Sequence, residues 1–218
     1  MNLTIFNGSP KRGNSNTAVM IDNFLRGYGR TEGNESTVHN VKRLSDLDQA
    51  VAAFGGSSSV LLAFPLYNYS VPAGVKEFIE KLERFKGACG GKKIGFLVQY
   101  GFPEAVHARP LEQYLESLAR LLSCGYLGTI IKGRCNDLAR RPDGKTLSGI
   151  TEIGARFGKT GLFDRALLDS FSKPETQSFF TRASARLFAA FANKFYWQAQ
   201  LRKNGALDKS LARPYEPE

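Results

Sequence analysis

Apolar runs of strand length alternate with amphipathic helical stretches over residues 1–131, and this alternation restricts the chain to few folds. The clearest run, Val60–Phe64, has five consecutive apolar residues between Ser59 and Pro65. A strand without polar alternation is buried on both faces, which is typical of a parallel sheet covered by helices. The next segment, Val75–Phe85, has apolar residues three and four positions apart, as a helix with one buried face requires.

Five strands with helices between them are predicted in this region. The expected strands are Leu3–Phe6, Thr37–Val41, Val60–Phe64, Ile94–Val98 and Leu127–Ile131, and the expected helices are Asn16–Leu25, Leu47–Phe54, Val75–Phe85 and Leu111–Leu122. Strands that alternate with helices form parallel sheets through right-handed crossovers. We therefore predict an α/β protein with a doubly wound five-stranded parallel sheet in the order 2-1-3-4-5.

The pattern changes after the fifth expected strand. Glycine and proline interrupt residues 132–149, which read as a loop or hairpin, and helical spacing resumes after them. Pro174 is expected to open a long helix that ends at Asn204-Gly205, because proline suits the first turn and glycine follows the last. We divide the chain into an α/β domain, residues 1–172, and a C-terminal helical extension, residues 173–218, which packs on the core or on a partner subunit.

The composition fits an ordinary globular protein. Of 218 residues, 42% are hydrophobic and 23% are charged, so the chain can bury its own core and is not disordered. No run reaches the roughly 18 apolar residues that a transmembrane segment needs. The first seven residues read as a strand rather than a signal peptide, and we expect a cytoplasmic location.

The net charge, 30 − 20 = +10, favours anionic partners such as nucleotides, nucleic acid or anionic lipid without choosing among them. Nucleic-acid binding is not predicted, because the chain has no basic–aromatic platform and no helix-turn-helix spacing. Three cysteines without a Cys-x-x-Cys pair give no zinc or iron–sulfur pattern, so no metal is expected.

A polar loop joins the first expected strand to the first expected helix. Residues 7–17 read Asn-Gly-Ser-Pro-Lys-Arg-Gly-Asn-Ser-Asn-Thr, which is neither a Walker A nor a dinucleotide-binding pattern. Glycine permits tight turns, the side chains offer donors, and the helix N-terminus adds free N–H groups. The alternative is a simple capped helix start, with Asn14 or Ser15 as the N-cap. The predicted ligands of a phosphate monoester are Ser9, Lys11, Arg12, Ser15, Asn16 and Thr17.

Two further loops follow the third and fourth expected strands. Tyr67 and Tyr69 offer flat faces, while Gly101 lets the backbone face a ligand edge. Each loop alone also fits an ordinary surface turn. His107 reads as a surface or hydrogen-bonded histidine, with a place at the mouth of the site as the alternative. The residues predicted to border a planar ring are Pro65, Leu66, Tyr67, Asn68, Tyr69, Tyr100, Gly101 and Phe102.

The three loops converge if the strand order is 2-1-3-4-5, and a phosphate site beside a flat-ring site describes a flavin mononucleotide (FMN) site. Gly8–Lys11 with Ser15–Thr17 resembles the first-loop pattern of the flavodoxin-like NAD(P)H-dependent FMN reductases. Pro65–Tyr67 with Pro72–Lys76 resembles their second pattern. Lys11 stands where arginine is usual in that family.

The resemblance implies a flavodoxin-like fold and an oxidoreductase in which FMN takes hydride from NADPH or NADH. Electrons would then pass to a small acceptor: a quinone, a nitroaromatic, an azo compound or free flavin. The flavin performs the redox step, so no catalytic residue is predicted. The family also implies a homodimer. The alternative is a flavodoxin-type FMN electron carrier, against which the charge of +10 and the C-terminal extension argue.

Two basic features stay open. The expected C-terminal helix carries an apolar stripe with arginine and lysine beside it, which fits packing on the core or a partner subunit, or an interfacial membrane helix. The stripe consists of Phe180, Leu187, Phe188, Phe191, Phe195 and Leu201. After the fifth strand, a second basic cluster reads as a solvated charge run or as a site for the 2′-phosphate or pyrophosphate of NADPH. It consists of Lys132, Arg134, Arg140, Arg141 and Lys145.

Overall fold

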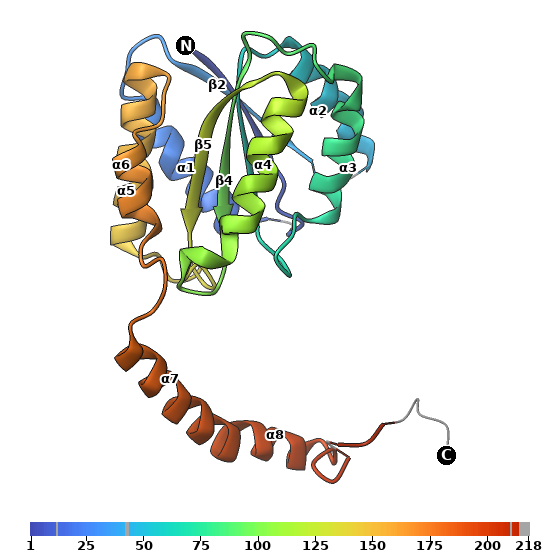
Figure 1. Ribbon diagram of the computed structural model, residues 1–218, viewed down its shortest axis with the longest axis vertical. Coiled ribbons are helices and arrows are strands. Elements are labelled where there is room, and N and C mark those ends of the chain that lie inside the picture. The colour runs from blue at the N-terminus through green and yellow to red at the C-terminus, as the bar shows by residue number, and fades with distance from the viewer. Residues whose placement is uncertain (12, 42–43, 210, 214–218) are drawn as a thin grey trace. The chain divides into compact units, whose positions relative to one another are not determined.

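The computed structural model describes residues 1–11, 13–41, 44–209 and 211–213. The chain divides into two compact units, Met1–Thr176 and Gln177–Glu218. The first unit contains the sheet and its covering helices, and the second consists of helix and irregular tail (Figure 1).

A five-stranded parallel sheet forms the centre of the first unit (Figure 1). Its strand order is β2-β1-β3-β4-β5. The strands are β1 (Asn2–Asn7), β2 (Glu35–Asn40), β3 (Ser59–Pro65), β4 (Lys93–Gln99) and β5 (Gly125–Lys132). The predicted fold class and strand order are therefore confirmed.

Helices cover both faces of the sheet (Figure 1). One face carries α1 (Asn16–Tyr28), α5 (Gly144–Thr160) and α6 (Arg165–Ser172); the other carries α2 (Leu44–Gly56), α3 (Ala73–Lys81) and α4 (Arg109–Leu122). Two short 3-10 turns are η1 (Leu82–Phe85) and η2 (Ala105–Ala108). The predicted helix Val75–Phe85 is thus an α-helix that tightens into η1.

The central strand β3 explains why one sequence run was apolar throughout. Val60, Leu62 and Phe64 join the buried cluster on the α2–α3–α4 face. Leu61 and Ala63 join the cluster on the α1–α5–α6 face. Each of these five residues is 0–1% exposed, so the sheet has a separate apolar core on each side.

The prediction of a loop or hairpin over residues 132–149 is wrong in its second part, because α5 begins at Gly144. Asp143 is the N-cap, and its carboxylate accepts hydrogen bonds from the N–H groups of Lys145 and Thr146. The Thr146 hydroxyl also donates to it, and these bonds lower the pKa of the carboxyl. The Asp143-Gly144 pair is therefore a helix start, although the same pair is also a turn signal.

The prediction that Pro174 opens the last helix is also wrong. The Pro174 carbonyl instead accepts a hydrogen bond from the Ala105 N–H at 2.9 Å. The helix starts with α7 (Phe179–Ala192), where Ser178 is the N-cap. A π turn, η3 (Asn193–Trp197), and α8 (Gln198–Lys203) continue it. The predicted end holds, because Gly205 follows the helix at φ 60°.

Helices α1 and α5 pack with their backbones in contact, which only glycine permits. A methyl group at Gly27 would lie 1.9 Å from the Thr151 carbonyl oxygen, and one at Gly154 would lie 2.0 Å from the Phe24 carbonyl oxygen. This contact fixes the position of α1, whose N-terminus follows the polar loop after β1.

Replacing Gly154 by alanine should therefore lower the free energy of unfolding by about 1–3 kcal/mol, because the helices must separate to admit the methyl group. Urea denaturation measures this change. Gly144→Ala in the same helix is the control, since nothing lies within 4 Å of the added atom, and it should stay within about 0.5 kcal/mol of the parent. Equal effects of the two substitutions would contradict the close contact.

Candidate functional site

A cleft of about 790 Å³ lies at the carboxyl end of the sheet. Its volume falls within the roughly 300–1,000 Å³ typical of small-molecule and cofactor sites. Every residue predicted in the second and third loops lines it, together with Asn16 from the start of α1 and two residues after β5. The lining residues are Asn16, Pro65, Leu66, Tyr67, Asn68, Tyr69, Gln99, Tyr100, Gly101, Phe102, Pro103, His107, Cys135 and Asn136.

A tight turn presents the two tyrosines of the second loop. Tyr67 and Ser70 exchange two backbone hydrogen bonds, at 3.2 and 2.9 Å, around Asn68 and Tyr69. Asn68 has φ 48° and Tyr69 has φ 61°, the paired left-handed conformation of a type I′ turn. A non-glycine pair in this region stores strain, and such strain clusters at binding sites. Tyr67 and Tyr69 are 53% and 59% exposed, so both rings are free to contact a ligand.

His107, which belongs to no sequence motif, lines the cleft together with the aromatic side chains. His107, in η2, lies 3.2 Å through Nδ1 from the Tyr69 hydroxyl, and its Nε2 lies 3.6 Å from a carboxylate oxygen of Glu104. The ring also packs 5.0 Å from the ring of Phe102, centroid to centroid. His107 therefore lies at the cleft, as the alternative interpretation of the sequence had it.

Three residues of the predicted ring-binding set are buried. Pro65 is buried at the end of β3, Leu66 is 8% exposed and belongs to the core, and Tyr100 is 5% exposed. The Tyr100 hydroxyl donates to the Glu104 carbonyl at 2.8 Å, and burial raises its pKa. Tyr100 thus supports the third loop from beneath.

The first loop has both the cap and the free N–H groups that the sequence offered as alternatives. The Ser15 hydroxyl accepts a hydrogen bond from the Ala18 N–H at 3.1 Å, which makes Ser15 the N-cap of α1. No described residue accepts a hydrogen bond from the backbone N–H groups of Lys11, Gly13 or Asn14. Such unpaired donors before a helix N-terminus suit an anion.

The predicted phosphate ligands differ in their exposure to solvent. Ser9, Ser15 and Thr17 are 4%, 3% and 0% exposed, whereas Lys11 is exposed. These four residues are not among those that line the cleft. Arg12 lies outside the described residues.

Asn16 has a structural partner that the sequence did not reveal. Its amide nitrogen donates to the Cys135 carbonyl and, at 3.2 Å, to the Asn136 carbonyl. Its amide oxygen accepts from the Ala139 N–H at 2.9 Å. The carboxamide therefore holds the segment after β5 against the start of α1.

Gln99 makes a second link between loops. Its side-chain nitrogen donates to the Thr17 hydroxyl at 3.2 Å, and both side chains are buried. Gln99 ends β4 and lines the cleft. The only sequence signal for this role of Gln99 was a polar residue directly after the apolar run Ile94–Val98.

Cys135 borders the cleft without being a nucleophile. Its thiol lies 3.4 Å from the Gly133 carbonyl, and burial raises its pKa to about 12. The thiol therefore stays protonated near neutral pH. Among the described residues, no group of three or more histidine, cysteine or acidic side chains could hold a metal ion.

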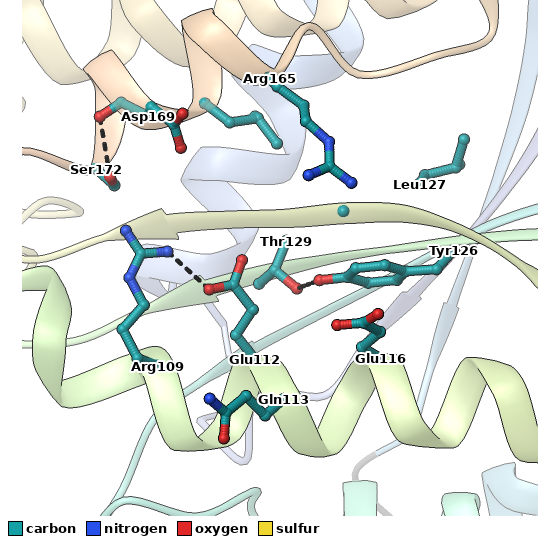
Figure 2. A pocket seen from close by; sticks show the side chains of 12 residues that line it. Arg109, Glu112, Gln113, Glu116, Tyr126, Leu127, Thr129, Arg165, Asp169 and Ser172 are labelled. Atoms are coloured by element: carbon teal, nitrogen blue, oxygen red, sulfur yellow. Dashed lines mark hydrogen bonds and ion pairs between the residues drawn. The ribbon is translucent and has the colours of Figure 1, made fainter.

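A second pocket, of about 300 Å³, lies beside the edge strand β5 and holds none of the predicted site residues. Figure 2 shows its charged side chains facing one another between α4 and α6. Arg109 pairs with Glu112 at 2.7 Å, and the Tyr126 and Thr129 hydroxyls are 2.8 Å apart (Figure 2). Burial raises the pKa of Tyr126 to about 12. These two pairs link side chains that line the pocket.

The basic cluster after β5 is not a single patch. The Lys132 ammonium donates to the Phe171 carbonyl at 2.8 Å and lies over that ring, and desolvation lowers its pKa. Lys132 and Lys145 line a separate groove. Arg140 and Arg141 are exposed, directly after the segment that Asn16 holds.

The strand order and the cleft at the carboxyl ends of the strands are those of an open, doubly wound α/β protein. Residues 1–145 match the family model described as a flavodoxin-like fold. The match spans more than half of the 218 residues, and the chain belongs to that family. The resemblance indicated by the sequence motifs is thereby confirmed.

Individual relatives either match a short part of the chain or match most of it at low sequence identity. Over 79 residues, the chain is 35% identical to FMN-dependent NADH:quinone oxidoreductase 2 of Bacillus cereus, a match that covers 31% of this chain and only 38% of that protein. An NADPH-quinone reductase structure from P. pentosaceus is 19% identical, with a TM-score of 0.53 over 82% of this chain and 99% of that one. An apo NADH:FMN oxidoreductase is 20% identical, with a TM-score of 0.56 over 83% and 93%. At these identities the structures show the shared fold.

Removing the Asn16 carboxamide should loosen the segment after β5. Asn16→Ala loses three hydrogen bonds and should lower the free energy of unfolding by about 1–3 kcal/mol. It should also speed hydrogen exchange at the Ala139 amide, which mass spectrometry or NMR can follow. Asn14→Ala, an exposed neighbour, is the control. Unchanged exchange at Ala139 would contradict the link.

Proposed function

We propose that the protein is an FMN-dependent NAD(P)H oxidoreductase that reduces a small acceptor such as a quinone, nitroaromatic, azo compound or free flavin. The observation that carries the proposal is one cleft at the carboxyl end of the sheet, lined by the two loops with flat side chains after β3 and β4 and by Asn16, where the polar loop after β1 enters α1. The flavin and nicotinamide in the name of the Bacillus relative support it.

The chain's residues fit FMN at both of its ends. The unpaired N–H groups of Lys11, Gly13 and Asn14 suit the phosphate, with the Lys11 ammonium nearby in sequence. We place Ser9, Ser15, Asn16 and Thr17 around the same group, as the family resemblance implies. Arg12, which lies outside the described residues, adds a positive charge to the same loop. The isoalloxazine ring would lie against residues 65–69 and 100–102. When bound, FMN supplies the hydride and electron transfer chemistry.

The protein residues at the cleft supply position and exchangeable protons. The exposed rings of Tyr67, Tyr69 and Phe102 would shield and orient a planar substrate. The Tyr69 hydroxyl and the His107 ring share a hydrogen bond that Glu104 flanks, so this group offers an exchangeable proton at the cleft.

We also propose a cytoplasmic homodimer. Cys89, Cys124 and Cys135 are free and buried, which suits a reducing compartment. The family resemblance supports the homodimer.

The purified protein should be yellow, and NADPH under nitrogen should bleach it. The phosphate loop can be tested separately by comparing two flavins. Lys11→Ala should weaken FMN binding roughly tenfold and leave riboflavin binding unchanged, because riboflavin lacks the phosphate. Fluorescence titration of both flavins measures this, with Lys159→Ala as the control. A colourless protein that FMN does not bind would refute the proposal, and bleaching only with a separate reductase would indicate an electron carrier.

The arginines after β5 are proposed to meet the 2′-phosphate or pyrophosphate of the nicotinamide coenzyme. Arg140→Ala/Arg141→Ala should raise the KM for NADPH about tenfold and that for NADH less, since only NADPH carries the 2′-phosphate. Steady-state assays with both coenzymes decide this. Equal rates with the two coenzymes, unchanged in the variant, would count against the assignment.

A further inference from the structure

The helix of the second unit is rich in basic and aromatic residues and has no acidic residue, and the proposed flavin chemistry does not account for this composition. The helix of residues 179–203 contains five basic residues and no aspartate or glutamate. Seven of its residues are aromatic, although the whole chain has only 16 phenylalanines, 8 tyrosines and 1 tryptophan. The basic residues are Arg182, Arg186, Lys194, Arg202 and Lys203, and the aromatic residues are Phe179, Phe180, Phe188, Phe191, Phe195, Tyr196 and Trp197.

The described aromatic side chains of this helix are exposed within it. Phe188, Phe191 and Phe195 are 72%, 61% and 58% exposed, and their spacing of three and four residues places them on one stripe. The Phe191 and Phe195 rings pack 4.6 Å apart, centroid to centroid. The η3 turn adds Tyr196 and Trp197, 56% and 58% exposed. The helix thus presents a stripe of phenylalanines, and the Tyr196 and Trp197 rings pack against each other beside it, 5.2 Å apart centroid to centroid.

Basic side chains adjoin this surface. The Lys194 ammonium lies 5.6 Å from the centre of the Phe195 ring. A lysine of this kind can lay its methylene chain along apolar surface while its charge reaches anionic groups. Arg202 and Lys203 occupy the last turn of the helix.

We propose that this helix binds in the plane of a membrane surface that contains anionic lipid. Phenylalanine, tyrosine and tryptophan favour the interface between headgroups and acyl chains, and lysine and arginine are attracted to anionic headgroups. The helix lies on the surface and does not span it, because in the described part of the chain no helix is long and apolar enough to cross a bilayer.

Charge favours lipid over a second copy of the helix. Two such helices would bring five basic residues against five others, with no acidic residue of the helix to offset them. Like charges across an interface oppose association, whereas an anionic surface gains about fivefold in affinity for each basic residue near it.

Trp197 is the only tryptophan of the chain, so its fluorescence reports on this helix alone. The full-length protein should show the emission of a water-exposed tryptophan. Vesicles of phosphatidylglycerol and phosphatidylcholine should shift the emission to the blue, and brominated lipid should quench it. Pure phosphatidylcholine should bind at least about tenfold more weakly, and added salt should reduce binding to the anionic vesicles.

Paired variants separate the contribution of the aromatic residues from that of the basic residues. Phe191→Ser/Phe195→Ser should abolish the blue shift, and Leu162→Ser/Tyr114→Ser, exposed apolar residues of the first unit, should not. Lys194→Glu/Arg202→Glu should weaken binding at least about tenfold, while Lys159→Glu/Arg120→Glu, with the same change in net charge, should not. Flavin content and the melting temperature show that each variant has folded.

Three results would overturn the proposal. The first is an absence of binding to anionic vesicles. The second is sedimentation with anionic vesicles without any change in Trp197 emission, which would place the contact on another surface. The third is a tryptophan already blue-shifted without vesicles in a protein with the mass of a dimer, where a second copy covers the helix.

Discussion

The backbone contact between α1 and α5 is the constraint on which the site depends. Glycine at positions 27 and 154 lets the two helices touch, and this brings the start of α1 beside the segment that follows β5. The Asn16 carboxamide can then bridge the two. The polar loop after β1 is therefore joined at one end to the central sheet and at the other to this helix pair.

Sequence patterns predicted the sheet because each strand obeys a local rule. The apolar run of β3 followed from burial on two faces, and the helical stripes followed from burial on one. The predicted residues of the second and third loops line one cleft, since the ends of neighbouring parallel strands meet at one edge. The sequence also suggested both functions of the first loop, and the helix cap and the free N–H groups coexist there.

What the sequence could not predict rests on distant pairs or on ambiguous local signals. Asn16 and Ala139 are 123 positions apart, and Thr17 and Gln99 are 82 apart, so no pattern within a window reveals either bond. Asp143-Gly144 fits a turn as well as a helix cap, and Pro174 fits a helix start as well as an irregular segment. At Asp143 the helix cap decided between the two conformations. At Pro174 the backbone hydrogen bond from Ala105 and the cap at Ser178 decided.

The Asn16 bridge has a consequence for recombining members of this fold family. The two acceptors and one donor that it uses belong to the backbone of residues 135, 136 and 139, so this link depends on the path of the segment and not on the identity of its side chains. A chimera that exchanges the segment after β5 for one of different length would leave a half-buried amide without its partners and widen the cleft. The start of α1 and this segment form one module, and they would have to be transplanted together.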